Sequence, residues 1–152
     1  MERKAEKPPY FISDDKSLLE VDVIHGYLTR SYWAKGIRRG RIETVIETSL
    51  CWGLYEQHED RSFQQIGFAR VLTDLSAIAY LMDVFVLEEH QGKGLGKWLV
   101  EEVLSCSTLK PVRRWILATA DAQSLYARYG FTPLPDPEHY MQKYDPEKYN
   151  RD

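Results

Sequence analysis

The chain has 152 residues, of which 23 are acidic and 20 are basic, so its formal net charge is −3. This length fits one domain with a full core, and a content of 43% hydrophobic residues excludes a disordered chain. The negative balance argues against nucleic-acid binding through bulk positive charge, and no apolar run is long enough for a membrane helix. No secretion signal is recognisable, so we expect a cytoplasmic protein without nucleic-acid or membrane partners.

A short strand and two helices are predicted near the N-terminus. Residues 1–9 are rich in charge and end in two prolines, so we expect a disordered tail before a single domain over residues 10–152. The apolar run at residues 10–12 predicts a first strand. Asp22 is a candidate N-cap of a first helix, and apolar side chains at helical spacing predict a second helix over residues 38–50.

A meander of strands is predicted in the middle of the chain. Three apolar runs with strand character cover residues 51–56, 65–72 and 78–87. Short polar segments that suit turns separate these runs, so we expect the three strands to pair in antiparallel fashion.

Helices and strands alternate in the C-terminal part of the prediction. An amphipathic helix is expected over residues 94–105, and a strand is expected over residues 115–118. Asp121 can cap a short helix that ends at Gly130, and a last strand is predicted near residues 140–144. The whole pattern predicts an α+β fold with an element order of about βααβββαβαββ.

A glycine-rich loop, QGKGLGK at residues 91–97, links the last strand of the meander to the amphipathic helix. Unpaired backbone N–H groups at a helix N-terminus attract anions such as phosphate, and glycines leave room for a close approach. The loop lacks the spacing of the nucleoside-triphosphate and dinucleotide fingerprints. A glycine-rich turn without a ligand is the structural alternative.

Two motifs follow one another along the chain, QGKGLG at residues 91–96 and LYARYGF at residues 125–131. The first matches the Q/R-x-x-G-x-G/A signature of the GNAT superfamily of acyl-CoA-dependent N-acetyltransferases. The second is similar to the L-Y-x-x-x-G-F helix end of that superfamily. The resemblance implies a mixed, largely antiparallel central sheet flanked by helices, and it implies acetyl-CoA as the co-substrate.

The resemblance also implies roles for individual residues. The N–H groups from Gly92 to Lys97 would bind the pyrophosphate of CoA, and the strand that ends near Val86 would pair with the pantetheine arm. Tyr126 would be the general acid that protonates the departing thiolate; the alternative is a core aromatic whose hydroxyl is bonded elsewhere. The residues implied to bind the cofactor are Phe85, Val86, Gln91, Gly92, Lys93, Gly94, Leu95, Gly96, Lys97 and Ser124.

One acidic and two aromatic residues are candidates for the acceptor side. A carboxylate within an apolar strand is costly unless it is paired or functional. Asp83 is therefore either a general base or ammonium anchor, or a structural residue that caps a bulge or pairs with an arginine. Tyr32 and Trp33 are expected to line the substrate pocket, with plain packing as the alternative. The histidines and cysteines lack ligand spacing, so no metal site is expected.

The function predicted from these residues is acetyl transfer to a primary amine of a small molecule, by direct attack of the amine on the thioester. Two alternatives stay open. One is a non-catalytic acyl-CoA-binding module with the same fold, and the other is an acetyltransferase whose acceptor is a protein lysine or N-terminus. The resemblance also implies that a homodimer can form.

Overall fold

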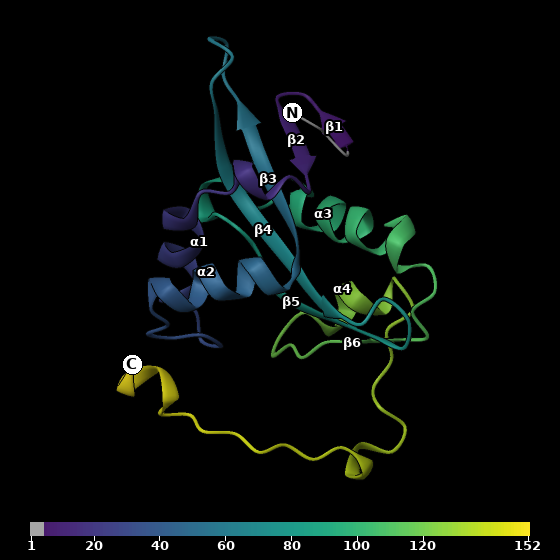
Figure 1. Ribbon diagram of the computed structural model, residues 1–152. Coiled ribbons are helices and arrows are strands. Elements are labelled where there is room, and N and C mark those ends of the chain that lie inside the picture. Colours follow the sequence, from purple (N-terminus) through teal and green to yellow (C-terminus); the bar gives the residue numbers. More distant parts are fainter. Residues whose placement is uncertain (1–4) are drawn as a thin grey trace.

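The computed structural model of the protein describes residues 5–152, which form one six-stranded sheet with helices on both faces (Figure 1). The strands are β1 (Ala5–Lys7), β2 (Tyr10–Ser13), β3 (Leu50–Gln57), β4 (Phe63–Thr73), β5 (Ile78–Val86) and β6 (Arg114–Ile116). The α-helices are α1 (Val21–Leu28), α2 (Arg39–Thr48), α3 (Leu95–Leu104) and α4 (Gln123–Ala127). Neighbouring strands are antiparallel except for the parallel pair β5–β6, which confirms the α+β class.

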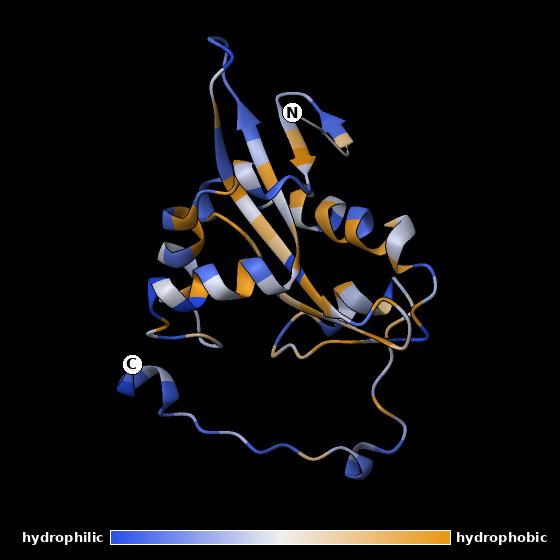
Figure 2. Cartoon of the chain, in the orientation of Figure 1, coloured by the Kyte–Doolittle hydropathy of each residue, from blue (hydrophilic) through white to orange (hydrophobic). Residues whose placement is uncertain are grey.

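Apolar side chains pack against both faces of the sheet. On one face, Ile24 and Leu28 of α1 and Ile42 of α2 are buried together with Phe68 and Phe85 of the sheet. Helix α3 covers the other face with its own apolar stripe, and the hydropathy colouring shows apolar residues on the strands between the two helical layers (Figure 2). The sheet is therefore held between two layers of helix, because each layer has one apolar side.

The helices and strands predicted between residues 10 and 131 are all present, with bounds shifted by a few residues. The predicted caps are wrong at two helices: Glu20 is the N-cap of α1 and Ala122 is that of α4, in place of Asp22 and Asp121. Neither observed cap residue forms a side-chain capping hydrogen bond. Within residues 5–152, no helix is long and apolar enough to cross a membrane.

Both ends of the chain differ from the prediction. Residues 5–7, which were expected in the disordered tail, form β1 and pair with β2, while residues 1–4 lie outside the described residues. No strand follows α4 in the part of the chain that the structure describes, so the strand predicted near residues 140–144 is wrong. Prolines at positions 133, 135 and 137 cannot donate a backbone hydrogen bond, and Tyr140 contacts β6 through its side chain, whose hydroxyl accepts a hydrogen bond from Arg114.

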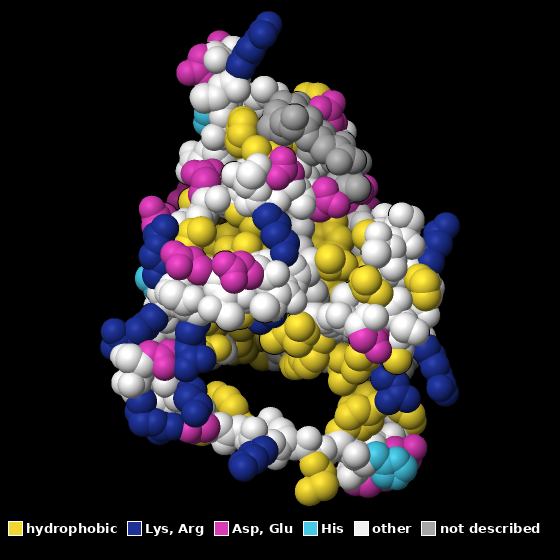
Figure 3. All heavy atoms as spheres, in the orientation of Figure 1, with side chains coloured by type: hydrophobic (Ala, Val, Ile, Leu, Met, Phe, Trp, Pro, Cys, Tyr) yellow, Lys and Arg dark blue, Asp and Glu magenta, His cyan; other side chains and the backbone are white. Residues whose placement is uncertain are grey.

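The C-terminal segment forms a strap, which we define as residues 132–147. The strap runs away from the body of the protein and returns toward α1 and α2, so that an opening is visible between it and the body (Figure 3). Its far end is anchored where Tyr149 packs against the α1–α2 cluster and where Asp152 pairs with Arg41. The strap thereby crosses the side of the molecule at which β5 and β6 end their pairing.

A bulge in β5 shapes the centre of the sheet. Phe68 of β4 is paired with Phe85, but Arg70 is paired with Met82, so β5 carries one residue more than β4 between these pairs. Asp83 lies in this bulge with a φ of 55°. The parallel pairing of β6 with β5 stops at Tyr80. Beyond this point the chain after β6 leaves β5, and the space between them becomes available to a ligand.

Candidate active site

A cavity of about 1040 Å³ opens where β5 and the chain after β6 separate. Its walls come from the loop between α1 and α2, from residues 80–84 of β5, from residues 117–122 and from α4. Tyr144 of the strap also contributes to the wall. The structure thus brings together the predicted catalytic and substrate-binding residues Tyr32, Trp33, Asp83 and Tyr126.

Asp83 is almost fully buried in the wall of the cavity, where 8% of its side chain is exposed. Its Oδ2 accepts a hydrogen bond from Nε of Arg70 at 2.5 Å, and its Oδ1 accepts one from Nε1 of Trp33 at 2.8 Å. Arg70 is also buried, and its Nη1 donates to Oγ of Ser49 at 3.1 Å. The bulge and the arginine pair of the structural alternative are therefore both present, and Asp83 still lines the cavity.

The loop between α1 and α2 forms an aromatic wall of the cavity. The rings of Tyr32 and Trp33 meet edge to face with their centres 5.1 Å apart, and the ring of Tyr27 lies 6.3 Å from that of Trp33. Trp33 is tied to β5 through Asp83. The hydroxyl of Tyr32 accepts a hydrogen bond from the amide of Ala120 at 3.1 Å. These two bonds hold the loop across the gap between β5 and the segment after β6.

Tyr126 reaches the cavity from α4. Its ring packs edge-on against Phe131, with ring centres 5.8 Å apart, and 9% of the residue is exposed. Burial raises the pKa of Tyr126, and the nearby Tyr32 adds a smaller increase. The hydroxyl therefore keeps its proton at neutral pH, as a general acid must. Packing in the core and an acid role are compatible at this position.

The glycine loop leads into the N-terminus of α3. Gly92 and Gly94 have φ values of 81° and 76°, in the left-handed region that favours glycine. The first N–H groups of a helix have no intrahelical partner, and Gly94, the N-cap of α3, has no side chain to cap them. No atom lies within 4 Å of a Cβ placed on either glycine, which leaves room for a phosphate group. Nε2 of Gln91 donates to the carbonyl of Val86 at 2.8 Å and ties the loop to the end of β5.

Most of the remaining cofactor candidates lie around the glycine loop and not in the cavity. Phe85 and Leu95 have buried side chains, so only their backbone groups can contact a ligand. Ser124 is exposed on α4 and does not line the cavity. Since the loop follows the end of β5 and the cavity adjoins its middle, a molecule that contacts both must be long and extended.

Several residues of the site were missed by the sequence analysis. Arg70 carried a usable signal, because a charged residue within an apolar strand needs a partner just as Asp83 does. Tyr27, Tyr80 and Tyr144 line the cavity but had no pattern that separates them from ordinary aromatic residues.

Three exposed side chains of the strap, Asp136, Glu138 and His139, bring ligand-type atoms within 4.8 Å of one another. The histidine spacing did not indicate this group, because two of its three members are carboxylates.

Comparisons with known proteins point to one protein family. A family model described as an acetyltransferase (GNAT) domain matches residues 47–133. A Gibberella zeae protein named as an acetyltransferase is 30% identical over 135 residues, which cover 78% of this chain and 76% of that protein.

Solved structures give the same result. The crystal structure of a GNAT-family acetyltransferase from Xanthomonas campestris pv. campestris has a TM-score of 0.85 at 43% identity, covering 95% of this chain and 99% of that one. A Mycobacterium tuberculosis protein, solved in complex with CoA, shares the fold with a TM-score of 0.62 at 20% identity, covering 81% and 72% of the two chains. The fold, the matched domain and the relatives together show that this chain belongs to the GNAT family of acetyltransferases.

Proposed function

We propose that the protein is a cytoplasmic, acetyl-CoA-dependent N-acetyltransferase that acts on a primary amine of a small molecule. The observation that carries the proposal is the cavity beside the β5 bulge, which places Tyr126, Asp83 and an aromatic wall together. The glycine loop follows the end of the same strand. A relative with this fold binds CoA, which supports the choice of an acyl-CoA donor.

The glycine loop and β5 are suited to the cofactor end of the site. The N–H groups from Gly92 to Lys97 would hold the pyrophosphate, because they are the free donors at the start of α3. The amide of Leu87 donates to Ile66 on β4 at 2.8 Å. Successive residues of a strand direct their backbone groups to opposite sides, so the Val86 amide points away from β4, toward the side where β6 no longer pairs with β5. There it can pair with an extended pantetheine arm.

The cavity residues supply the acceptor end and the proton transfers. Asp83 would anchor the incoming ammonium, since each carboxylate oxygen keeps a lone pair beyond the bonds from Arg70 and Trp33. The ammonium loses a proton to water, and the nitrogen then bonds to the acetyl carbon as the carbon–sulfur bond breaks. Tyr126 donates its proton to the sulfur and regains one from the nitrogen, which becomes an amide.

The residues that line the cavity favour the proposed enzyme over the binding module and over the protein acetyltransferase. A binding module would need neither an acid at Tyr126 nor a polar group at Asp83, so their joint presence in the cavity favours an enzyme. The strap contributes Tyr144 to the cavity and runs past the body there, which favours a small acceptor over a folded protein. A homodimer remains a prediction, and light scattering of the purified protein checks it.

Release of CoA from acetyl-CoA in the presence of single amines tests the proposal. We expect thiol release that depends on both the amine and the enzyme, together with an acetylated amine identified by mass spectrometry. Binding of acetyl-CoA without release for any amine would support the binding module. Release that occurs only with peptides would support the protein acceptor.

A further inference from the structure

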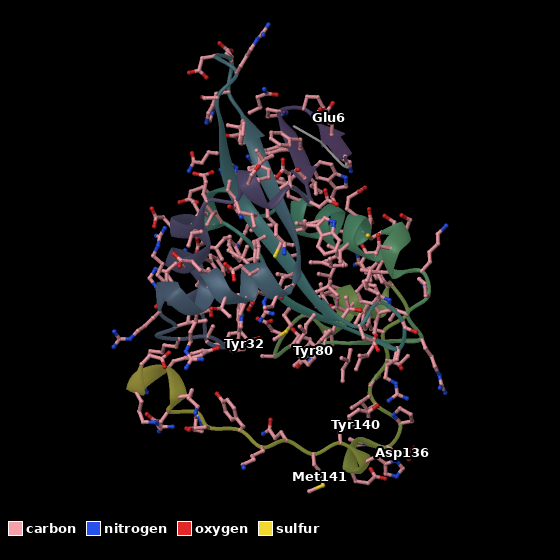
Figure 4. The ribbon with its side chains drawn as sticks, viewed as in Figure 1. Glu6, Tyr32, Tyr80, Asp136, Tyr140 and Met141 are labelled. Atoms are coloured by element: carbon pink, nitrogen blue, oxygen red, sulfur yellow. The ribbon has the colours of Figure 1, made fainter. Side chains whose placement is uncertain are left out.

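Five aromatic side chains surround the acceptor part of the cavity. They are Tyr27, Tyr32, Trp33, Tyr80 and Tyr144, and they come from α1, the following loop, β5 and the strap. Tyr32 and Tyr80 lie at the edge of the body that faces the strap (Figure 4). Aromatic faces from elements far apart in the sequence are thus gathered around one space.

Three of these aromatic residues are much more exposed than a core needs. Tyr32 is 64% exposed, Trp33 is 39% exposed and Tyr144 is 70% exposed. Large apolar groups that gather on an exposed concave surface mark a binding site more often than packing. Trp33 and Tyr32 are also held in place by their bonds to Asp83 and Ala120, so part of the ring arrangement exists before a ligand enters.

The charges around the cavity restrict the ligand further. The charged residues among its lining are Arg30, Asp83 and Asp121. Arg30 is bound to both carboxylate oxygens of Glu88, at 2.5 and 3.1 Å, and Asp83 is paired with Arg70. Among these lining residues, the pairs leave no unpaired cation for a phosphate and too few acidic groups for a polycation.

We infer that the acceptor is a molecule with one primary ammonium group, its only positive charge, and a flat aromatic ring system to which this group is linked. This inference rests on the proposed acetyltransferase function and names its substrate class. The ring would stack between the aromatic side chains, and the ammonium would lie toward Asp83 and the aromatic faces, which attract cations.

A matched pair of amines tests the inference. The compounds 2-phenylethylamine and 2-cyclohexylethylamine have the same linker and similar apolar surface, but only the first has a flat π face. We expect kcat/KM for 2-phenylethylamine to exceed that for its saturated partner by about tenfold, since a merely apolar pocket would accept both. Spermidine and glucosamine 6-phosphate, a polycation and an anion-bearing amine, should be poorer acceptors still.

Tyr144 offers a variant that leaves the core intact, because it is exposed on the strap. Tyr144→Leu should raise KM for 2-phenylethylamine about fivefold and reduce the preference over 2-cyclohexylethylamine, while Tyr144→Phe keeps both near the wild-type values. The KM for acetyl-CoA should stay unchanged in both variants.

The outcomes separate this inference from the proposed function. If the enzyme releases CoA with other amines, but kcat/KM for 2-phenylethylamine is equal to or lower than that for 2-cyclohexylethylamine, the aromatic acceptor is wrong and the acetyltransferase proposal still stands. Binding of acetyl-CoA with no release for 2-phenylethylamine also overturns it. A protein that does not bind acetyl-CoA contradicts the proposed function itself.

Discussion

Asp83 has a left-handed backbone conformation, with a φ of 55°, that costs a non-glycine residue about 1–3 kcal/mol. The buried ion pair with Arg70 and the hydrogen bond from Trp33 hold the residue in this conformation. Such strain is found most often where a site requires a backbone to be placed against its preference. At this position the bulge, the aromatic wall and the cavity all depend on one carboxylate.

The first prediction concerns the charge of Asp83. Asp83→Asn leaves Arg70 buried without its partner, so we expect the free energy of unfolding to fall by about 3–5 kcal/mol in urea denaturation. The double variant Asp83→Asn/Arg70→Gln removes both charges and should recover at least half of this loss. Equal stability of the single and double variants would show that the ion pair does not hold the bulge.

The double variant also separates the two catalytic roles considered for Asp83. If Asp83 anchors the ammonium, the variant raises KM for the amine while the pH optimum stays in place. If Asp83 is the general base, kcat falls and the pH optimum moves upward. Rate measurements across the pH range with a saturating concentration of acetyl-CoA distinguish these results, and we expect the first.

Tyr126→Phe tests the general acid. Since burial keeps the wild-type hydroxyl protonated, loss of this acid should lower kcat by about 100-fold or more while affinity for acetyl-CoA is kept. Because burial raises the pKa of Tyr126, the wild-type rate should lose this proton donor only at a pH above the range in which an exposed tyrosine ionises. An unchanged kcat, with chemistry shown to limit the rate, would remove Tyr126 from the mechanism.

At the scale of the elements, β3 contains a glycine, Gly53, against which a buried aromatic ring packs. A Cβ at Gly53 would overlap the phenol ring of Tyr55, which is fully buried two residues further along the strand. We expect Gly53→Ala to lower the free energy of unfolding by about 1–3 kcal/mol, because the core there has no spare volume. Gly40→Ala, at an open position in α2, is the control and should change stability by less than about 1 kcal/mol.

The elements show why the sequence predicts some features and not others. Helices and strands between residues 10 and 131 follow from apolar periodicity and from turn residues, which act locally. The glycine loop and Tyr126 could be located because their motifs are contiguous. Pairing of Asp83 with an arginine could be considered, but Arg70 could not be singled out as the partner, because the pair depends on the register shift between β4 and β5. The strand predicted near residues 140–144 is wrong, because pairing with a sheet edge depends on tertiary structure that the local sequence does not show.

At the scale of the molecule, β5 connects the two parts of the proposed site. Its end leads into the glycine loop at α3, and its bulge lines the cavity on the side of α1 and α2. The early end of the β5–β6 pairing gives an extended ligand a path between them. The strap adds Tyr144 to the wall of the cavity, so residues from distant parts of the chain line the same space.

Calorimetric titration with acetyl-CoA tests the central claim most directly, with ATP and NADH as control ligands. The wild type should bind acetyl-CoA selectively, and Gly94→Val should abolish binding because its side chain fills the space beside the loop. Gly130→Val is the matched control, since Gly130 also has a positive φ, at 89°, and open space around it, but it follows α4 and is not part of the glycine loop. We expect Gly130→Val to lose stability and keep its affinity. Absence of acetyl-CoA binding by the wild type, or equal affinities for Gly94→Val and the wild type, would contradict the account.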